Sequence, residues 1–483
     1  MRVGEGGSVT SRRDEDVADR RRVGVVTDSR AVAGWLGRDR VDTGLVLLVL
    51  LIIVSLALVA HSARQPTHEI VAVGLAGLLV ARGLIRGRRV LVPHAAGALL
   101  ILAVARFVDA KGHPGTAWLA TVVAGLALVL PDRPEAPAAD EERRHVWALV
   151  DRTTGDSLAP FALRHDKSYV MSSDGLAAVA YRVRFGTAVA SGDPVGDSSS
   201  RADAIEAFVE HARAHGWRVA VIGAGEEIAA LWRERGLWGL AIGREVLIDV
   251  ATFDLIGRKF RNLRQAVQRS RNAGVTTEIV AEQSLAPKVR DELADVARRA
   301  NRPLPPRGFA MILDHPLTGV HPGTYIAIAR DRAGNAIGFQ RFASADAGRE
   351  LSLDLPFLDP SGPNGIDERL AVDMVEWARE HDARRISLAF AAFPEVFDAE
   401  RRGVRRRLAR WAVHRFDPWI HLESLYRYLR KFHAFGPRRF VLLRKRDIVW
   451  VVTALLSLEF SRPRPPRRPS RVRGAMRRLT GVR

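Results

Sequence analysis

The spacing of hydrophobic positions divides the 483-residue chain into a membrane-like block and a longer alternating part. Residues 1–40 are polar and Arg-rich, which is typical of a disordered basic tail. The uncharged apolar run Thr43–Ala60 that follows is long enough to cross a bilayer. Three shorter apolar runs come next, at Ile70–Ala81, Val90–Ala105 and Thr116–Leu130. We therefore expect a transmembrane block of about four helices over 41–131, with soluble core helices as the alternative for the three weaker runs.

The distribution of cations around these runs predicts how the block is oriented. Arg clusters precede the first run and separate the second from the third, whereas the loops at 61–67 and 109–113 carry one cation each. Because cytoplasmic loops of membrane proteins are enriched in Lys and Arg, both termini are expected on the cytoplasmic side. The sequence thus predicts a multi-pass protein of the cell (inner) membrane whose soluble, catalytic part faces the cytoplasm.

From about His145 to about residue 460, strand-like and helix-like stretches alternate, after a Pro- and charge-rich linker expected over 132–145. Strands are expected at 176–184, 187–190, 217–223, 245–250 and 275–280, on both sides of the turn 331–335, and at 350–355 and 385–390. Helices are expected at 201–216, 257–275 and 366–381. Two such rounds predict an α/β (α+β) fold with tandem acetyltransferase-like (GNAT-type) lobes over 146–255 and 256–460. The Arg-rich residues 461–483 predict a second disordered tail.

The charge balance narrows the classes of function. Lys and Arg number 74 against 54 Asp and Glu, a net charge of +20, and such an excess indicates a polyanionic partner such as RNA or anionic lipid. Almost all of the excess is Arg, which a GC-rich genome would partly explain. The chain has no Cys, so thiolate nucleophiles and Cys zinc sites are excluded. It also lacks HExxH, Walker A and GxGxxG motifs, and neither a metal, a cofactor nor DNA is expected.

One stretch, "GRKFRNLRQAVQRSRNAGV" over Gly257–Val275, carries six cations and no acid. Phe260, Leu263 and Val267 recur at helical spacing and predict a buried stripe. The cations project elsewhere, and no acid stands one turn away to balance them. A solvated basic face would explain this pattern, but the charge imbalance favours contact with phosphates.

The soluble part also carries a series of motifs in a fixed order. They are "DSLAPFALRHDKSYVMSSDGLAAVAYRV", "AVASGDPVGD", "RKFRNLRQAVQRSRNAG", "LSLDL" with "PNGIDERL", and "SLAFAAF". Over roughly 150–445 this order resembles the catalytic domain of phosphatidylglycerol lysyltransferases, the multiple-peptide-resistance family of aminoacyl-phosphatidylglycerol synthases. The resemblance implies a tandem acetyltransferase-like fold. It also implies transfer of an amino acid from aminoacyl-tRNA to the glycerol hydroxyl of phosphatidylglycerol at the cytoplasmic membrane face.

The resemblance implies roles for residues at matching positions. Asp354 and Glu368 would hold the substrate ammonium or accept the proton of the lipid hydroxyl. A substrate-binding role is implied for a larger set: Asp193, Arg258, Lys259, Arg261, Asn262, Arg264, Asn364 and Arg439. Local chemistry offers plainer explanations for two of them, since Asp193 lies in a Gly- and Pro-rich turn and Asn364 would cap the helix that follows it.

The sequence departs from the family pattern before "RGF", where Pro306 stands in place of a frequent acid. Because a lysine side chain would need a carboxylate partner, the transferred amino acid, lysine or another, stays open. Two other hypotheses also stay open. One is a membrane-tethered acyl-CoA-dependent acyltransferase of the same fold, although the Gly-rich turn that would cradle a pyrophosphate is not found. The other is a non-enzymatic protein that binds anionic lipid.

Overall fold

The computed structural model describes Ala76 and residues 92–110, 120–125, 137–300, 309–392 and 422–460. The chain divides into two compact units, of which the first comprises Met1–Asp132 together with Arg213–Trp217 and contains helix α4 (Val92–Ala110). Within the described ranges, no helix has both the length and the apolar character needed to cross a bilayer. Most of the expected transmembrane block 41–131 lies outside these ranges, as do both expected tails. The multi-pass arrangement therefore stays a prediction.

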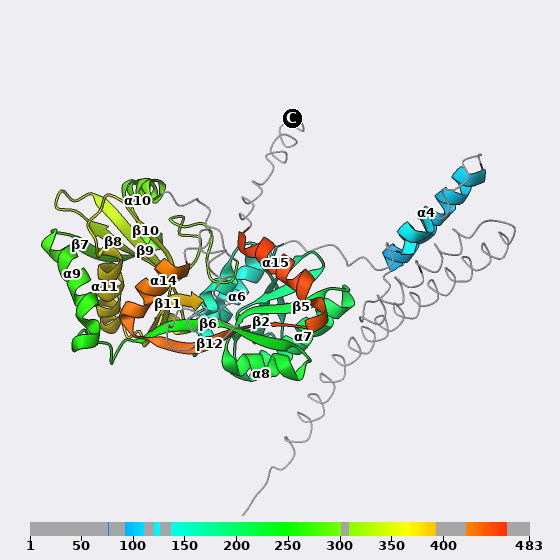
Figure 1. The fold of residues 1–483 in the computed structure, drawn as a ribbon, viewed down its shortest axis with the longest axis horizontal. Helices are drawn as coiled ribbons and strands as arrows, with labels where there is room; N and C mark the ends of the chain where they lie inside the picture. The colour runs from blue at the N-terminus through cyan, green and yellow to red at the C-terminus, as the bar shows by residue number, and fades with distance from the viewer. Residues whose placement is uncertain are drawn as a thin grey trace, which may run out of the picture. The chain divides into compact units, whose positions relative to one another are not determined.

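A mixed sheet is the frame of the second unit (Figure 1). Its strands follow the order β1-β2-β3-β5-β12-β6-β11-β10-β9-β8-β7, with β4 beside β2. The bounds are β1 Ser168–Met171, β2 Ala177–Arg184, β3 Thr187–Ser191, β4 Val195–Gly196, β5 Arg218–Ala224, β6 Trp238–Asp249, β7 Thr276–Ala281, β8 Thr324–Arg330, β9 Ala336–Ala345, β10 Glu350–Leu358, β11 Arg385–Ala392 and β12 Phe435–Leu443. The pairs β3–β5 and β10–β11 are parallel, and the other described neighbours run antiparallel. The expected mixed α/β architecture is confirmed in this unit.

Helices cover both faces of the sheet. They are α6 Asp140–Arg152, α7 Arg201–Ala214, α8 Glu226–Glu234, α9 Arg261–Asn272, α10 Pro287–Arg299, α11 Ile366–Glu380, α14 Leu422–Leu429 and α15 Ile448–Phe460. Leu263 of α9 and Leu370 of α11 share a core with Phe342 of β9. Leu293 of α10 packs in a different core with Phe339 of β9. Because side chains alternate along a strand, α9 and α11 cover one face of this half of the sheet and α10 covers the other.

Strand β12 joins the end of the described chain to strands from its first half. It lies between β5 and β6 and pairs antiparallel with both. The helix after it, α15, buries Val451 and Leu458 against Val189 of β3. Late residues therefore complete the sheet beside strands from 168–249, and the expected lobe boundary between residues 255 and 256 stays a prediction.

The elements predicted within 176–390 all have counterparts in the structure, and their ends agree within a few residues except at β6, which begins earlier at Trp238. The predicted linker 132–145 is wrong at its end, because α6 begins at Asp140. The acids at the start of α6 occupy its first turn, where the helix dipole favours negative charge. Val146, Leu149 and Val150 then recur at helical spacing and are buried.

Candidate active site

Arg439 on β12 is the centre of a buried group of charges. Its guanidinium donates hydrogen bonds to Asp156 Oδ1 at 2.8 Å, to Glu245 Oε2 at 2.6 Å and to Asp193 Oδ2 at 3.3 Å. The carboxylates come from the loop after α6, from β6 and from the turn after β3. We call these four residues the Arg439 cluster, and each of the four side chains is at most 8% exposed. The structure thus brings together two predicted substrate-binding residues, Asp193 and Arg439.

The turn after β3 directs Asp193 toward Arg439 for local steric reasons. Gly192 has a φ of +74°, a left-handed conformation that glycine adopts without strain. The Asp193 carboxylate accepts a hydrogen bond from the Gly225 backbone N–H at 2.9 Å. A Cβ atom at position 225 would lie 2.8 Å from Asp193 Oδ2. Glycine at both positions therefore allows this carboxylate to reach the cluster.

The Arg439 cluster holds one cation against three carboxylates. Burial, and then repulsion from Asp156, raise the pKa of Asp193 to about 7, although Arg439 opposes the shift. Burial alone would lower the pKa of Arg439, but the neighbouring carboxylates raise it further above its usual value. The guanidinium therefore stays charged while Asp193 titrates near neutral pH. An ionised Asp193 leaves an excess of negative charge that suits an ammonium group.

A second buried group surrounds Arg341 on β9. Its guanidinium donates to Glu282 Oε2 at 2.7 Å and to Asp354 Oδ2 at 3.0 Å, and all three side chains are 0% exposed. We call these three residues the Arg341 cluster. Burial raises the pKa of Asp354 to about 6, against the lowering effect of Arg341. Asp354 lies where the pairing of β10 with β9 skips from Leu353 to Leu355, and such a bulge re-aims a side chain.

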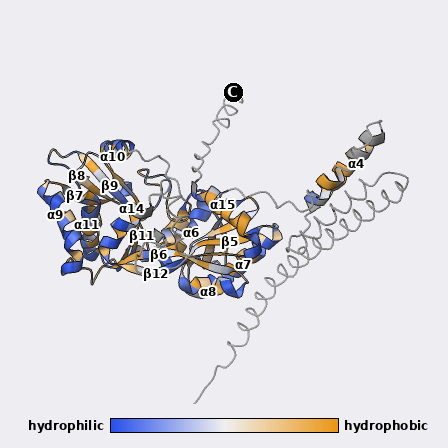
Figure 2. Cartoon of the chain, viewed as in Figure 1, coloured by the Kyte–Doolittle hydropathy of each residue, from blue (hydrophilic) through white to orange (hydrophobic). Residues whose placement is uncertain are grey.

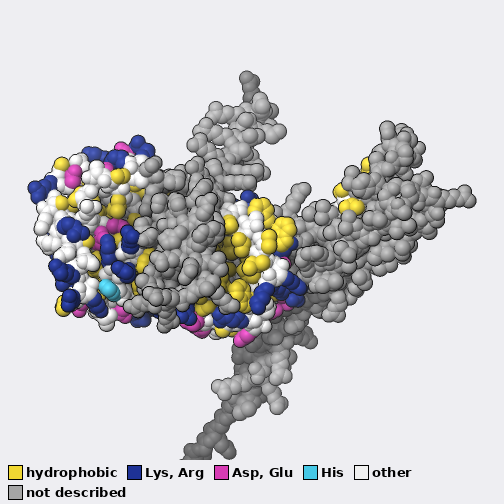
Figure 3. Space-filling model, viewed as in Figure 1, with side chains coloured by type: hydrophobic (Ala, Val, Ile, Leu, Met, Phe, Trp, Pro, Cys, Tyr) yellow, Lys and Arg dark blue, Asp and Glu magenta, His cyan; other side chains and the backbone are white. Residues whose placement is uncertain are grey.

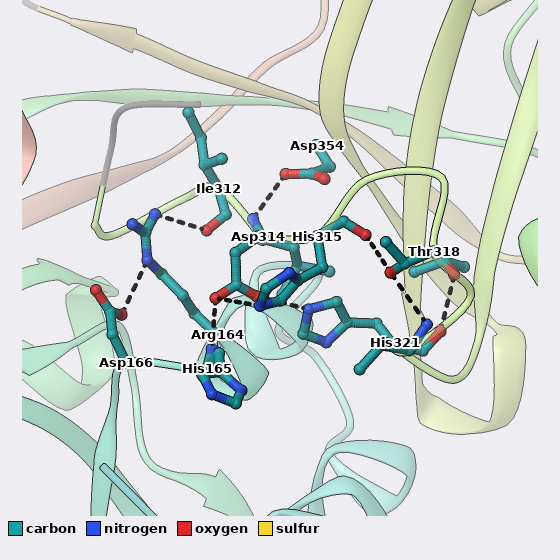
Figure 4. Close-up of polar contacts among 12 residues, drawn as sticks. Arg164, His165, Asp166, Ile312, Asp314, His315, Thr318, His321 and Asp354 are labelled. Atoms are coloured by element: carbon teal, nitrogen blue, oxygen red, sulfur yellow. Dashed lines mark hydrogen bonds and ion pairs between the residues drawn. The ribbon is translucent and has the colours of Figure 1, made fainter. Parts of the chain in front are cut away.

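The segment 309–321 runs between the two clusters. The Leu313 N–H donates to Asp354 Oδ1 at 2.8 Å, a contact that Figure 4 shows. Two residues earlier, the terminal methyl of Met311 would lie 3.4 Å from a Cβ on Gly223, whose carbonyl accepts a hydrogen bond from Arg439 at 3.4 Å. Asp354, predicted as a catalytic residue, is thus positioned to hold the backbone of this segment.

Asp314 anchors the same segment to the loop before β1 (Figure 4). Its carboxylate is hydrogen-bonded to His321 Nε2 at 2.8 Å and accepts the His165 backbone N–H at 3.0 Å. Burial would raise the pKa of Asp314, but the hydrogen bond from His321 and nearby positive charges lower it to about 2. The rings of His165 and His315 meet edge to face, with centroids 5.3 Å apart. The ionised carboxylate therefore fixes the segment at a second point.

Glu368, the other predicted catalytic residue, lies on the opposite face of the sheet from Asp354. Arg341 and Gln340 are neighbours on β9, so their side chains point to opposite faces. Arg341 reaches Asp354, whereas Gln340 Nε2 donates to Asp367 Oδ1 at 2.6 Å in the first turn of α11. Glu368 follows Asp367 in that turn and forms an ion pair with Lys431. The two predicted catalytic carboxylates therefore do not share one site.

The basic stretch before and within α9 has the predicted amphipathic form. Phe260, Leu263 and Val267 are buried, as expected. The cationic or polar residues at its start are exposed: Arg258, Lys259, Arg261 and Asn262. His433, which lies just before β12, is hydrogen-bonded through Nε2 to the Lys259 carbonyl at 3.0 Å. Figure 3 shows Lys and Arg side chains over the α9 end of the molecule.

Arg264 differs from its exposed neighbours. Its guanidinium donates to the Gly257 carbonyl at 2.7 Å and also to the Leu255 carbonyl. The side chain therefore folds back onto the loop that precedes the helix. Part of its hydrogen-bonding capacity stabilises that loop.

A family described as "Phosphatidylglycerol lysyltransferase, C-terminal" matches residues 147–442. The match includes both buried clusters and the whole basic helix. The chain belongs to this family. Its relatives named below are lysylphosphatidylglycerol synthetases and similar proteins, so the family is one of aminoacyltransferases.

Among the similar proteins is an MprF-like domain protein of Mycobacterium tuberculosis, 45% identical over 389 residues, which cover 79% of this chain and 80% of that protein. Another is the lysylphosphatidylglycerol biosynthesis bifunctional protein LysX of Mycobacterium avium, 33% identical over 316 residues. That match covers 64% of this chain but 26% of LysX. The chain therefore spans about a quarter of the length of this LysX relative.

Two solved structures share the fold of this phosphatidylglycerol lysyltransferase-family chain. One is the C-terminal domain of a protein assigned as a lysylphosphatidylglycerol synthetase from Agrobacterium fabrum, with a TM-score of 0.57 and 22% identity over 66% of this chain and 96% of that one. The other is L-PGS from Bacillus licheniformis, with a TM-score of 0.57 and 20% identity over 67% of this chain and 97% of that one. At this identity they show the fold alone.

In this family member Asn364 does not cap α11, so that prediction is wrong. The N-cap is Gly365, which has a φ of +101°. A Cβ at position 365 would lie 2.1 Å from the Ala266 carbonyl oxygen of α9. Close packing of α9 on α11 therefore requires glycine at the cap, and Asn364 remains exposed beside it.

Four charged residues of the clusters were not singled out from the sequence: Asp156, Glu245, Glu282 and Arg341. A usable signal existed for two of them. Glu245 and Arg341 lie beside apolar residues in predicted strands, in "EVLIDV" and "AIGFQRFAS". A charged residue inside a buried strand needs a partner, which makes it a candidate for a polar cluster. The partner's identity depends on the tertiary fold.

Proposed function

We propose that this chain transfers the aminoacyl group of an aminoacyl-tRNA to a hydroxyl of phosphatidylglycerol at the cytoplasmic membrane face. The observation that carries the proposal is the match to the phosphatidylglycerol lysyltransferase family over 147–442, which encloses the Arg439 cluster and the basic helix. The net charge of +20 agrees with two anionic substrates.

In the proposed reaction the lipid hydroxyl oxygen attacks the carbonyl carbon of the aminoacyl ester. The ester bond to the terminal ribose breaks, and the proton lost by the lipid hydroxyl passes to the departing ribose oxygen. One ester replaces another, so no oxidant or further energy source is consumed. Positioning and charge stabilisation are sufficient for such a transfer, and a chain without Cys can perform it.

The Arg439 cluster is the proposed site for the ammonium group of the transferred amino acid. Asp193 is its most exposed member, with 8% of its side chain accessible. An incoming ammonium next to the Asp193 carboxylate would offset the excess of negative charge in the cluster. It would also favour the ionised form of Asp193, whose pKa is raised to about 7 by burial and by repulsion from Asp156, against the opposing charge of Arg439.

The exposed start of the basic helix is the proposed contact for tRNA phosphates. Arg258, Lys259 and Arg261 are exposed, and the stretch of sequence that contains them has no acid to pair with them. Asn262 beside them adds a neutral donor and acceptor. Arg264 would contribute less because it already donates to two backbone carbonyls.

Asp354 and Glu368 are assigned different proposed roles because they lie on opposite faces of the sheet. Asp354 is a positioning residue that orders segment 309–321 through the Leu313 N–H. Glu368, paired with Lys431 in the first turn of α11, lies on the face that α9 covers. We retain Glu368 and the adjacent Asn364 as candidates for contact with the lipid or the tRNA end.

Lipid mass spectrometry of cells that express the full chain would test the proposed function. We expect an aminoacylated phosphatidylglycerol, whose mass identifies the amino acid, in cells that make the wild-type protein. Asp193→Asn should reduce this lipid strongly, whereas Asp291→Asn, a matched change at an exposed position of α10, should not. Membrane-localised protein without any aminoacylated lipid would contradict the proposal.

A further inference from the structure

Helix α15 is apolar on both of its sides. Its inner stripe, Val451, Ala454 and Leu458, is buried against the sheet. The outward side chains are also mostly apolar and yet exposed: Ile448 46%, Val449 71%, Trp450 48%, Val452 42% and Leu456 49%. A helix on the surface of a soluble domain normally presents polar residues outward. A contiguous exposed apolar face of this kind indicates an interaction surface.

Figure 2 shows α15 coloured as largely hydrophobic, and Figure 3 shows hydrophobic side chains gathered at the same place with Lys and Arg beside them. Three successive cations, separated from the start of α15 by Asp447, begin a cationic border: Arg444, Lys445 and Arg446. They line a hollow of about 940 Å³ together with Arg233, Arg235 and Trp238. No carboxylate is found among the described residues that line this hollow.

Two acids near this border are engaged in ion pairs. Asp447 is 9% exposed and pairs with Arg218 at 3.5 Å, and Glu206 pairs with Arg235 at 2.9 Å. Two tryptophans lie under cations, because Lys445 Nζ is 5.8 Å from the centre of the Trp238 ring and the Arg218 guanidinium is 4.9 Å from that of Trp450. The border therefore keeps an excess of positive charge next to exposed aromatic rings.

We propose that α15 and the cationic hollow form a docking surface for an anionic lipid bilayer. Apolar side chains of the outer stripe would enter the acyl region, and the two tryptophans would lie at the headgroup level. The hollow would bind lipid phosphates through its cations, of which Arg235 already pairs with Glu206. This surface is distinct from the Arg439 and Arg341 clusters, and the proposal does not rest on the proposed reaction.

Charge and hydrophobicity together select the bilayer over other occupants. A nucleic acid would satisfy the cations but would leave the apolar stripe of α15 in water. A second copy of the chain would cover the apolar stripe but would bring the same cationic hollow with its own charge of +20. Only a surface with both acyl chains and phosphates matches both the apolar outer stripe of α15 and the cationic hollow. The Arg-rich sequence that follows Phe460, with nine Arg and no acid, has the same preference.

The absence of Cys from the chain allows a site-specific test with the full-length protein. Leu456→Cys would carry an environment-sensitive fluorophore on the outer stripe. Leu176→Cys, at a residue 43% exposed in the turn between β1 and β2, is the matched control. Each labelled protein is placed in nanodiscs of phosphatidylcholine, with or without phosphatidylglycerol, and quenching by nitroxide-labelled lipids is measured.

We expect quenching of the probe at position 456 to exceed that at position 176 by about twofold or more, and only when phosphatidylglycerol is present. Lys445→Gln combined with Arg233→Gln should reduce that quenching while leaving the thermal midpoint unchanged. Equal quenching at the two positions would overturn the proposal. A spectral response of the 456 probe to tRNA instead of lipid, or concentration-dependent self-quenching between copies, would overturn it in favour of the other occupants.

Discussion

The molecule places cationic side chains in two opposite surroundings, and the Arg439 cluster and the start of α9 show the contrast. Arg439 is 4% exposed and bonded to three carboxylates. Arg258, Lys259 and Arg261 are exposed in a stretch that contains no acid. Removing one partner of a buried ion pair leaves an uncompensated charge, whereas an exposed cation contributes little to folding. The first group therefore belongs to the folded frame, and the second is available to a partner.

The largest expected effect comes from Arg439→Ala. Loss of the guanidinium leaves Asp156, Asp193 and Glu245 buried without a cation, and we expect the free energy of unfolding to fall by about 3–5 kcal/mol. Chemical denaturation of the full chain in detergent would measure the loss. Arg298→Ala, which removes an exposed cation 74% accessible on α10, is the control and should change stability by less than about 0.5 kcal/mol. Equal losses of stability in Arg439→Ala and Arg298→Ala would contradict the contrast between buried and exposed cations.

The next largest expected effect is the pH dependence that the buried Arg439 cluster gives to stability. Asp193 has a pKa of about 7 in the folded chain against a reference value of 3.8. Between these values the folded chain keeps a proton that the unfolded chain releases, so the Asp193 contribution to stability falls as pH rises from about 4 to about 7. Its steepest slope is about 1.4 kcal/mol per pH unit. Asp193→Asn should flatten the profile, and identical slopes for the variant and the wild type would contradict this assignment.

A triple replacement at the start of α9 should affect binding and not folding. With Arg258→Ala, Lys259→Ala and Arg261→Ala combined, we expect weaker tRNA binding and a log–log salt slope smaller by about 2, because up to three phosphate contacts are lost. The thermal midpoint should stay near the wild-type value. Fluorescence anisotropy with labelled tRNA across salt concentrations measures the slope. An unchanged slope would mean that this face does not bind phosphates.

The smallest expected effect is that of Arg264→Ala. This variant tests whether one helix carries both a cation that stabilises the fold and cations that bind a partner. Loss of its hydrogen bonds to the Gly257 and Leu255 carbonyls should lower the free energy of unfolding by about 1 kcal/mol. The tRNA salt slope should change less than with Arg261→Ala. If Arg264→Ala instead weakened tRNA binding most among the single variants, Arg264 would be a main phosphate contact.

The sequence predicted the parts of the fold that repeat a local pattern. The buried stripe Phe260, Leu263 and Val267 and the hairpin around 331–335 follow from spacing alone, and both are confirmed. Strand β12 was not predicted, because "FGPRRFVLL" has Gly, Pro and two Arg directly after its first residue, and its place between β5 and β6 depends on strands about two hundred residues earlier. Helix α6 was missed because charged residues of its first turn resemble a linker.

The candidate site was predictable residue by residue but not as an arrangement. Family motifs identified Asp193 and Arg439, yet nothing local indicated that they meet or that Asp156 and Glu245 join them. The motifs also paired Asp354 with Glu368, although strand alternation at Gln340 and Arg341 places the two on opposite faces. Such relations depend on register and on bulges, which a single sequence does not fix.

Steady-state kinetics of aminoacyl transfer to phosphatidylglycerol in nanodiscs would test the central claim most directly. With aminoacyl-tRNA as the varied substrate, the triple α9 variant should raise KM about tenfold with little change in kcat, and Asp193→Asn should lower kcat more than it raises KM. These two results would show that the exposed cations bind tRNA while the buried cluster serves the reacting amino acid. Transfer that is unaffected by either change, or no transfer by the wild-type chain with any aminoacyl-tRNA, would contradict the account.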